Sequence, residues 1–268
     1  MSKLIRSVSV VSGTTLLSRL VGFARDIVCA SVFGAHFGFD AFLVAFKIPN
    51  FFRRLFAEGA FSQAFVPVLS EHYLKHPRAK TLVLIDKIFG LLLVATSVLA
   101  VLVYQVAPQV IMVFAPGYAD DPHVFSLTVH MLQITFPYLV FISLIAMVSA
   151  IYNCNQKFFL PTFSPIILSI TSIIAATIAK YNGGSTIYLA YGVIIAGFLQ
   201  LGLLLYGMKS FQRLPRIRLS LNDKSVKSIL KLMGAALFGV SVVQLGLMIE
   251  TLLASYLPSG SISWLYYA

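Results

Sequence analysis

Residues 18–26 (SRLVGFARD) and residues 40–58 (DAFLVAFKIPNFFRRLFAE) decide the fold, because they place charged side chains inside two long apolar runs. A helix of about 20 largely apolar residues crosses a bilayer, and both runs, residues 8–33 and 39–69, exceed that length. One Arg or Lys at the centre of a membrane helix costs about 2.5 kcal/mol or more, so such residues normally face a protein interior or a water-filled cavity. The two stretches therefore predict a membrane protein with an internal cavity suited to an anion.

The composition of the whole chain indicates the same class. Of its 268 residues, 59% are hydrophobic and 11% are charged, and the mean hydropathy is +0.90. Soluble domains carry about 25% charged residues, so this chain is too apolar to resemble them. The net charge of +11 could indicate a nucleic-acid partner, but the basic residues lie mostly between the apolar runs, as in cytoplasmic loops. We therefore expect contact with membrane lipids and none with nucleic acid.

The apolar runs predict an all-α, polytopic membrane protein with about seven transmembrane helices. A β-barrel would need short alternating strands, which the long runs do not show. The expected spans are residues 8–33, 39–69, 87–114, 124–153, 161–181, 187–208 and 229–257. They divide the chain into a six-helix lobe (residues 1–212), a cytoplasmic linker (213–228) and the start of a second lobe (229–268).

The distribution of Lys and Arg predicts the orientation in the membrane. If the N-terminus is cytoplasmic, fourteen of the 20 basic residues lie in inner loops and only Lys180 lies in an outer loop. Cytoplasmic loops carry the excess of positive charge in membrane proteins. We therefore expect a cytoplasmic N-terminus.

The polar segment of residues 214–228 separates six spans from a seventh. Its composition is typical of a solvated linker, and an amphipathic segment resting on anionic headgroups fits the same residues. The seventh span weakly repeats the first, because Gly246, Glu250, Ala254 and Ser255 have the spacing of Gly22, Asp26, Ala30 and Ser31. This repeat indicates a second, related half. Since the chain ends where an eighth span has barely begun, we expect it to be part of a longer protein.

One face of the first span is polar. On a helix that turns about 100° per residue, this face is formed by Ser12, Thr15, Arg19, Gly22 and Asp26. Arg19 lies about 16 Å from the start of the span, close to the middle of the bilayer. Arg25 points about 120° away from Arg19. A simpler interpretation of Arg25 and Asp26 is that they lie near the outer end and extend to the interface.

The second span carries Asp40, Lys47, Arg54 and Glu58 on one face. Arg54 and Glu58 are four residues apart and can pair, and Asp40 and Lys47 lie two turns apart on the same side. Arg53 points elsewhere and would remain the unpaired cation, so we expect Arg53 rather than Arg54 to bind a ligand. Pro49 removes a helical hydrogen bond and predicts a kink at its position.

Three arginines at different depths predict an anion pathway: Arg53 toward the cytoplasm, Arg19 near the middle and Arg25 toward the outside. A guanidinium group binds phosphate oxygens through two parallel hydrogen bonds and stays charged at any relevant pH. Such a ladder is suited to a diphosphate. The sequence shows no phosphate-binding glycine loop, no His/Cys metal cluster and no nucleophile motif, so we expect neither a catalytic residue nor a metal or cofactor.

Several segments resemble the MurJ (MviN) family of lipid II flippases, within the multidrug/oligosaccharidyl-lipid/polysaccharide exporter group. The similarity covers the whole chain and is most specific over residues 40–67. It is carried by residues 18–26, 40–50 (DAFLVAFKIPN), 53–67 (RRLFAEGAFSQAFVP), 115–117 (APG), 135–138 (TFPY) and 259–264 (SGSISW).

The resemblance implies fourteen membrane helices in the full protein, with two six-helix lobes around a cationic cavity in the bacterial inner membrane. It implies export of an undecaprenyl-diphosphate-linked disaccharide pentapeptide by alternating access. Arg19, Arg25, Asp40 and Arg53 match positions that are functionally important in the family, which makes them the expected substrate-binding residues. The expected supporting charges and hinge are Asp26, Lys47, Arg54, Glu58 and Pro49.

Other functions fit parts of the pattern. An exporter of another polyprenyl-linked glycan, or of drugs, would share the architecture, although arginines in the cavity favour an anionic substrate. A membrane enzyme acting on a polyprenyl phosphate would need a carboxylate cluster or a base, and the acidic residues here are scattered beside basic ones. A noncatalytic scaffold for wall synthesis would not need charges at mid-membrane depth. The sequence indicates neither a protein partner nor the energy source.

Overall fold

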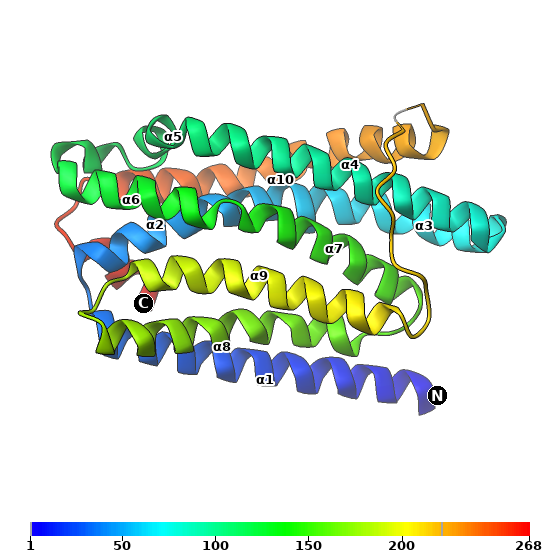
Figure 1. Ribbon diagram of the computed structural model, residues 1–268, viewed down its shortest axis with the longest axis horizontal. Coiled ribbons are helices and arrows are strands. Elements are labelled where there is room, and N and C mark those ends of the chain that lie inside the picture. Colours follow the sequence, from blue (N-terminus) through cyan, green and yellow to red (C-terminus); the bar gives the residue numbers. More distant parts are fainter. Residues whose placement is uncertain (1, 221) are drawn as a thin grey trace.

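The protein is a bundle of long helices lying side by side, as the computed structural model shows (Figure 1). The structure describes residues 2–220 and 222–268, and the side chains of all of these except residues 2–8, 55–58, 238, 240 and 243. The elements are α1 (Ser2–Phe33), α2 (Phe37–Phe52), the π-helix η1 (Arg53–Phe61), α3 (Ser62–Lys75), α4 (Arg78–Gln105), α5 (Ala107–Phe114), the 3₁₀-helix η2 (Pro116–Asp120), α6 (Pro122–Thr135), α7 (Tyr138–Cys154), α8 (Phe159–Tyr181), α9 (Ile187–Met208), α10 (Lys224–Ala254) and α11 (Ser261–Tyr267). The described residues form no strand, which confirms the predicted all-α class.

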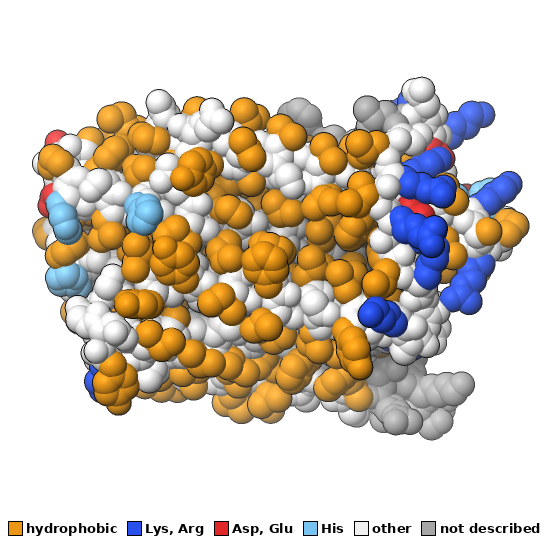
Figure 2. All heavy atoms as spheres, viewed as in Figure 1, with side chains coloured by type: hydrophobic (Ala, Val, Ile, Leu, Met, Phe, Trp, Pro, Cys, Tyr) orange, Lys and Arg blue, Asp and Glu red, His pale blue; other side chains and the backbone are white. Residues whose placement is uncertain are grey.

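Four helical stretches are long and apolar enough to cross a membrane: Arg78–Gln105, Pro122–Cys154, Phe159–Tyr181 and Ile187–Met208. They correspond to four of the seven expected spans. The expected spans at residues 8–33, 39–69 and 229–257 are helical as well, and they remain predictions as membrane crossings. The visible face of the molecule has a broad apolar belt, with charged side chains gathered at its two ends (Figure 2).

The expected second span is one helical run with a change of helix type in its middle. α2 continues through Pro49, where the predicted kink stays a prediction, and the π-helix η1 begins four residues later. Proline lacks the N–H that would bond the carbonyl of Ala45. The hydroxyl group of Thr135 in α6 lies 3.4 Å from that carbonyl oxygen. The neighbouring helix thus supplies a donor where proline removes one.

Proline also divides two of the other runs. The expected span at residues 87–114 is two helices, because α4 ends at Gln105 and α5 has Pro108 in its first turn. The run at residues 124–153 is interrupted between α6 and α7, where Pro137 lies just before α7. Proline is well accommodated at the start of a helix, where its missing N–H has no helical partner.

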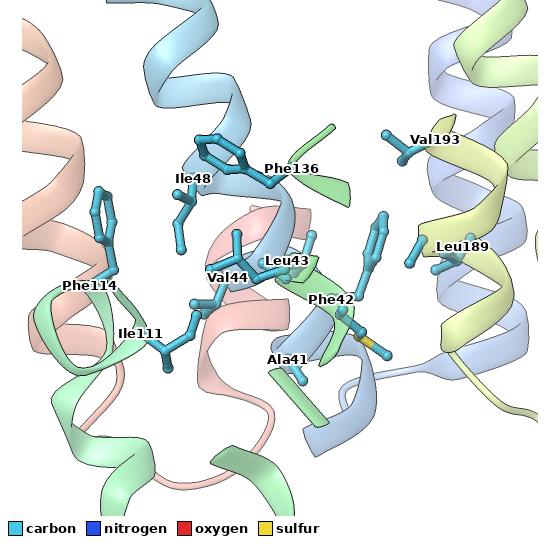
Figure 3. Packing of buried hydrophobic residues seen from close by; sticks show 14 of the residues in the cluster. Ala41, Phe42, Leu43, Val44, Ile48, Ile111, Phe114, Phe136, Leu189 and Val193 are labelled. Carbon is cyan, nitrogen blue, oxygen red and sulfur yellow. The ribbon is translucent and has the colours of Figure 1, made fainter. Parts of the chain in front are cut away.

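Two clusters of buried apolar side chains hold the helices together. The first centres on α2 and includes Phe42 and Ile48 of that helix, Phe136 after α6 and Val193 of α9 (Figure 3). The second joins α3, α4, α7 and the C-terminal end of α9. Residues of both clusters also line the cavity described below.

The chain between α9 and α10 is not helical in its described part, residues 213–220 and 222–223. This linker runs across the end of the bundle at which α1 begins, whereas the C-terminus lies toward the opposite end (Figure 1). At its end, Asp223 bonds the ammonium group of Lys87 in α4 at 2.6 Å. The hydrogen bond from Lys87 lowers the pKa of the Asp223 carboxyl group. The predicted linker therefore packs on the helices instead of being free in solvent.

Close packing of α8 on α9 depends on a glycine, and this yields a test. A Cβ atom at Gly192 would lie 2.9 Å from Cβ of Ala175, whereas a Cβ atom at Gly202 would meet no heavy atom within 4 Å. We expect Gly192→Val to destabilise the protein by about 1–3 kcal/mol, since overpacking forces neighbouring atoms apart. Thermal unfolding in detergent, followed by circular dichroism, measures the effect. Gly202→Val is the matched control, and an equal loss in both variants would contradict the packing argument.

Candidate anion-binding cavity

A cavity of about 830 Å³ lies between α1, α2, η1, α7, α8, α9 and α10. Four basic side chains line it: Arg25, Lys47, Arg53 and Arg54. None of its described lining residues is Asp or Glu. Its remaining polar wall is neutral and is formed by Asn and Gln amides and Ser hydroxyls from α2, α7, α8, α9 and α10. The cavity is therefore lined by basic, neutral polar and apolar side chains, without a described acidic one.

Arg25 lies on the wall, and a carboxylate balances its charge. Its Nε and Nη2 atoms donate to Oδ1 of Asp26 at 2.9 and 2.8 Å. Nη2 also donates to the hydroxyl oxygen of Tyr266 at 3.0 Å, and this hydroxyl donates to the same Asp26 oxygen at 2.8 Å. The Arg25 and Asp26 side chains are 24% and 36% exposed. Tyr266 belongs to α11, so this network joins the first helix to the last one.

Arg53 and Arg54 both line the cavity, although only Arg53 was the expected ligand. Nε of Arg53 donates to Oδ1 of Asn50 at 3.0 Å, and Asn50 in turn donates to the carbonyl of Phe46 at 3.0 Å. Arg53 is therefore not free of partners, and its expected role as a ligand group stays a prediction. Successive side chains diverge less in a π-helix than in an α-helix, because each turn contains more residues. This geometry helps two consecutive arginines to face one cavity.

The Glu58 side chain lies outside the described residues, so the expected pairing of Arg54 with Glu58 stays a prediction. The Arg54 side chain is exposed and forms part of the cavity wall. Sequence reasoning assigned it to a salt bridge within its own helix, because residues four apart are neighbours in an α-helix. The π-helix from Arg53 to Phe61 changes that spacing.

The expected pairing of Asp40 with Lys47 is contradicted. Nζ of Lys47 donates instead to the hydroxyl oxygen of Thr251 in α10 at 3.3 Å. Asp40 accepts hydrogen bonds from the backbone N–H groups of Gly260 and Ser263, at 2.5 and 2.7 Å, and from the Ser263 hydroxyl. Backbone N–H groups at the start of a helix lack helical partners and attract a carboxylate. At 4% exposure, Asp40 is buried at the start of α11 and does not line the cavity.

The structure does not bring Arg19 together with the other arginines. Its side chain is exposed on α1 and is not part of the cavity wall. Among the described residues it makes no hydrogen bond or ion pair. Of the predicted three-arginine ladder, Arg25 and Arg53 meet at the cavity. Lys47 and Arg54, expected only as supporting charges, join them there.

Sequence reasoning missed Tyr266 and the neutral wall. Nothing in the sequence around Tyr266 indicates a contact with Arg25, 241 residues away. The neutral wall includes Gln200, which is 2% exposed. An amide in the middle of the apolar α9 sequence is a signal that could have found it, because buried polar side chains in membrane helices normally face an interior.

Comparisons with known proteins agree in pointing to one family. The family model described as lipid II flippase MurJ matches residues 29–268. The chain is 43% identical over 270 residues to the lipid II flippase MurJ of Burkholderia cenocepacia, covering 99% of this chain and 52% of that protein. It is 42% identical over 262 residues to the probable lipid II flippase MurJ of Haemophilus influenzae, covering 95% and 51%.

A solved structure of lipid II flippase MurJ in an inward closed conformation is also similar. Its TM-score to this chain is 0.81 at 29% sequence identity, and the match covers 96% of this chain and 53% of that one. The chain spans about half the length of the curated relatives it matches.

The contacts of Asp40 predict a structural effect. Asp40→Ala leaves the N–H groups of Gly260 and Ser263 without their acceptor, and each unsatisfied buried group costs about 1–3 kcal/mol. We therefore expect a clearly lower midpoint of thermal unfolding. Asp120→Ala, at an exposed carboxylate with no hydrogen bond to a described residue, is the control and should leave the midpoint unchanged. If Asp40→Ala is as stable as its control, the contact with α11 does not support the fold.

Proposed function

This chain belongs to the MurJ family of lipid II flippases, and from that premise we propose that it serves to export a lipid-linked diphosphate. The proposed substrate is lipid II, the undecaprenyl-diphosphate-linked precursor of peptidoglycan. It would pass from the inner to the outer leaflet of the bacterial cytoplasmic membrane, with the N-terminus of the chain in the cytoplasm. The polyprenyl tail would remain in the bilayer while the polar headgroup passes through the cavity.

The single observation that carries this proposal is the charge of the cavity wall. Four basic side chains face about 830 Å³ of space, and no described carboxylate shares the wall. Cations held at a low dielectric constant repel one another, and an anion of charge near −2 or −3 relieves that repulsion. Guanidinium groups suit a diphosphate because they bind its oxygens in pairs.

We assign the diphosphate to Arg53 and Arg54 of η1, with Lys47 one to two turns earlier on the same run. Arg25 is the weaker candidate, since Asp26 already balances its charge. Arg19 is exposed at mid-span in α1 and would meet the substrate at another stage of transport. We assign Asp40 to contacts that close the protein rather than to the substrate.

The contacts at the end opposite the linker support alternating access. There Asp40 bonds the start of α11, Tyr266 bonds Arg25 and Asp26, and the hydroxyl of Ser255 accepts from the backbone N–H of Gly117 at 3.1 Å. If the N-terminus is cytoplasmic, these contacts close the outer end. Export requires them to break while the inner end closes, and hydrogen bonds between polar groups can exchange with water when they do so.

The alternatives explain less of the geometry. Cationic drugs would be repelled by the four basic side chains, and a scaffold would not need a basic cavity. An exporter of a different polyprenyl-linked glycan would bind the diphosphate with the same basic side chains. Its substrate would differ from lipid II in the glycan, which would meet the neutral polar side chains of the cavity.

The test is translocation of a labelled lipid-linked diphosphate by the full-length protein in vesicles. We expect Arg53→Gln and Arg54→Gln each to lower the rate by about ten- to a hundredfold, since a hydrogen bond to a charged group contributes about 1.5–3 kcal/mol. Lys80→Gln removes one positive charge from an exposed site outside the cavity and is the control. Equal rates in all three variants, at equal amounts of folded protein, would disprove the assignment.

A further inference from the structure

The linker between α9 and α10 contains a short basic and apolar segment, residues 216–219 (RIRL), which is neither helix nor β-structure and which we name the linker strand only for brevity. Its four side chains are all exposed. From its placement we infer that the linker strand is a lipid-contact surface that binds anionic headgroups of the cytoplasmic leaflet. This inference depends on the predicted cytoplasmic N-terminus and is independent of the proposed transport function.

A buried carboxylate fixes the backbone of the linker strand to α4. Asp86 has no exposed surface and accepts two hydrogen bonds from the guanidinium group of Arg213, at 3.0 and 2.6 Å. It also accepts one from the backbone N–H of Arg216, at 2.8 Å. Removing a partner from a buried charge is strongly destabilising, so a carboxylate with three donors holds the chain firmly in place.

One helical turn further along α4, a glycine lets the linker strand touch the helix backbone. A Cβ atom at Gly90 would lie 2.5 Å from the carbonyl oxygen of Arg218 and 2.8 Å from its nitrogen. No side chain fits between them, because real Cβ atoms do not approach other atoms so closely. Together, Asp86 and Gly90 hold the strand along the side of α4 at two points.

This attachment decides where the side chains of the strand can point. Nε of Arg218 lies 3.9 Å from Oδ2 of Asp86, so this side chain reaches back toward α4. Ile217 and Leu219, on either side of Arg218, are 63% and 64% exposed, so neither side chain is packed away against α4. Two aliphatic side chains are thus presented on a segment whose backbone is attached to the helix.

The depth of the linker strand matches the edge of the bilayer. The hydrocarbon core is about 30 Å thick, which is about 20 helical residues. Counted back from Gln105, the last residue of α4, this length ends close to Asp86. The strand crosses α4 between Asp86 and Gly90, at the boundary between hydrocarbon and headgroups. Lys and Arg side chains gather at this end of the visible face, next to the apolar belt (Figure 2).

A membrane surface of anionic lipid fits both kinds of side chain in the strand. Aliphatic side chains at the headgroup boundary leave water, and the Arg216 side chain beside them meets lipid phosphates. The cytoplasmic leaflet is negatively charged and attracts basic segments that lie next to a membrane span. The linker strand would thus fix the chain that leads into α10 to the membrane surface as well as to α4.

Depth-dependent quenching of single fluorophores tests the inference. The protein, in a background with Cys29→Ala and Cys154→Ser, carries an environment-sensitive label at Ile217→Cys, Leu219→Cys or Asn222→Cys. It is reconstituted in vesicles of phosphatidylglycerol and phosphatidylcholine. We expect labels at positions 217 and 219 to be quenched by a shallow nitroxide lipid, and the label at the exposed, polar position 222 to be quenched by aqueous iodide. Unchanged thermal unfolding establishes that the background is folded.

Matched substitutions separate charge from attachment. We expect Arg216→Gln, at a side chain with no contact to Asp86, to reduce nitroxide quenching at position 217 and to weaken its dependence on phosphatidylglycerol. Lys224→Gln makes the same change of charge at an exposed position just beyond the linker and should have no effect.

Gly90→Ala forces the strand away from α4 and should also reduce the quenching. Gly202→Ala, with no heavy atom near its added Cβ, should not. Equal iodide quenching at positions 217 and 222 would overturn the inference by showing that the strand is in water. Protection of position 217 from both quenchers would overturn it as well, by showing that protein covers the strand.

Discussion

A charge within a membrane-spanning segment must meet a counter-charge, a hydrogen-bond donor or acceptor, or water, and much of this structure follows from that constraint. Asp26 meets Arg25 and Tyr266, Asp40 meets the start of α11, and Asp86 meets Arg213 and the backbone of the linker. Each acidic group thus binds a segment that is far away in the sequence or attached to another helix. The basic groups behave differently, because four of them share one cavity. These carboxylates hold separate segments of the bundle together, and no described carboxylate lies on the wall of the basic cavity.

The sequence was sufficient to predict those features that depend on one helix at a time. Apolar runs predicted the helices, and the residues at positions 25 and 53 were correctly placed beside a cavity. The pairing of Asp40 with Lys47 failed, because spacing along a helix identifies neighbours only on that helix. The true partners, Ser263 and Thr251, lie 223 and 204 residues further along the chain. The pairing of Arg54 with Glu58 stays a prediction, and the π-helix changes the α-helical spacing on which that prediction rests.

The two ends of the bundle differ in how the last helices are attached. At the end near the C-terminus, the contacts are hydrogen bonds between side chains and backbone groups of α1, α2, η2, α10 and α11. At the other end, the linker is held by a buried ion pair and by direct backbone contact. In the middle, Lys47 bonds Thr251 across the cavity edge. The cavity therefore lies between one attachment made of exchangeable polar contacts and another that is fixed to α4.

The burial of Asp40 also bears on how the protein is made. Its carboxylate is satisfied by residues at positions 260 and 263, so some 220 residues must be synthesised before the first of these donors exists. At about 5–20 residues per second, that interval is on the order of ten to forty seconds. Throughout this time the second helix holds a carboxylate without its final partners. The contact between α2 and α11 can therefore form only after α11 has been synthesised. The rate of translation, rather than the rate of helix packing, sets the earliest time at which these helices can be joined.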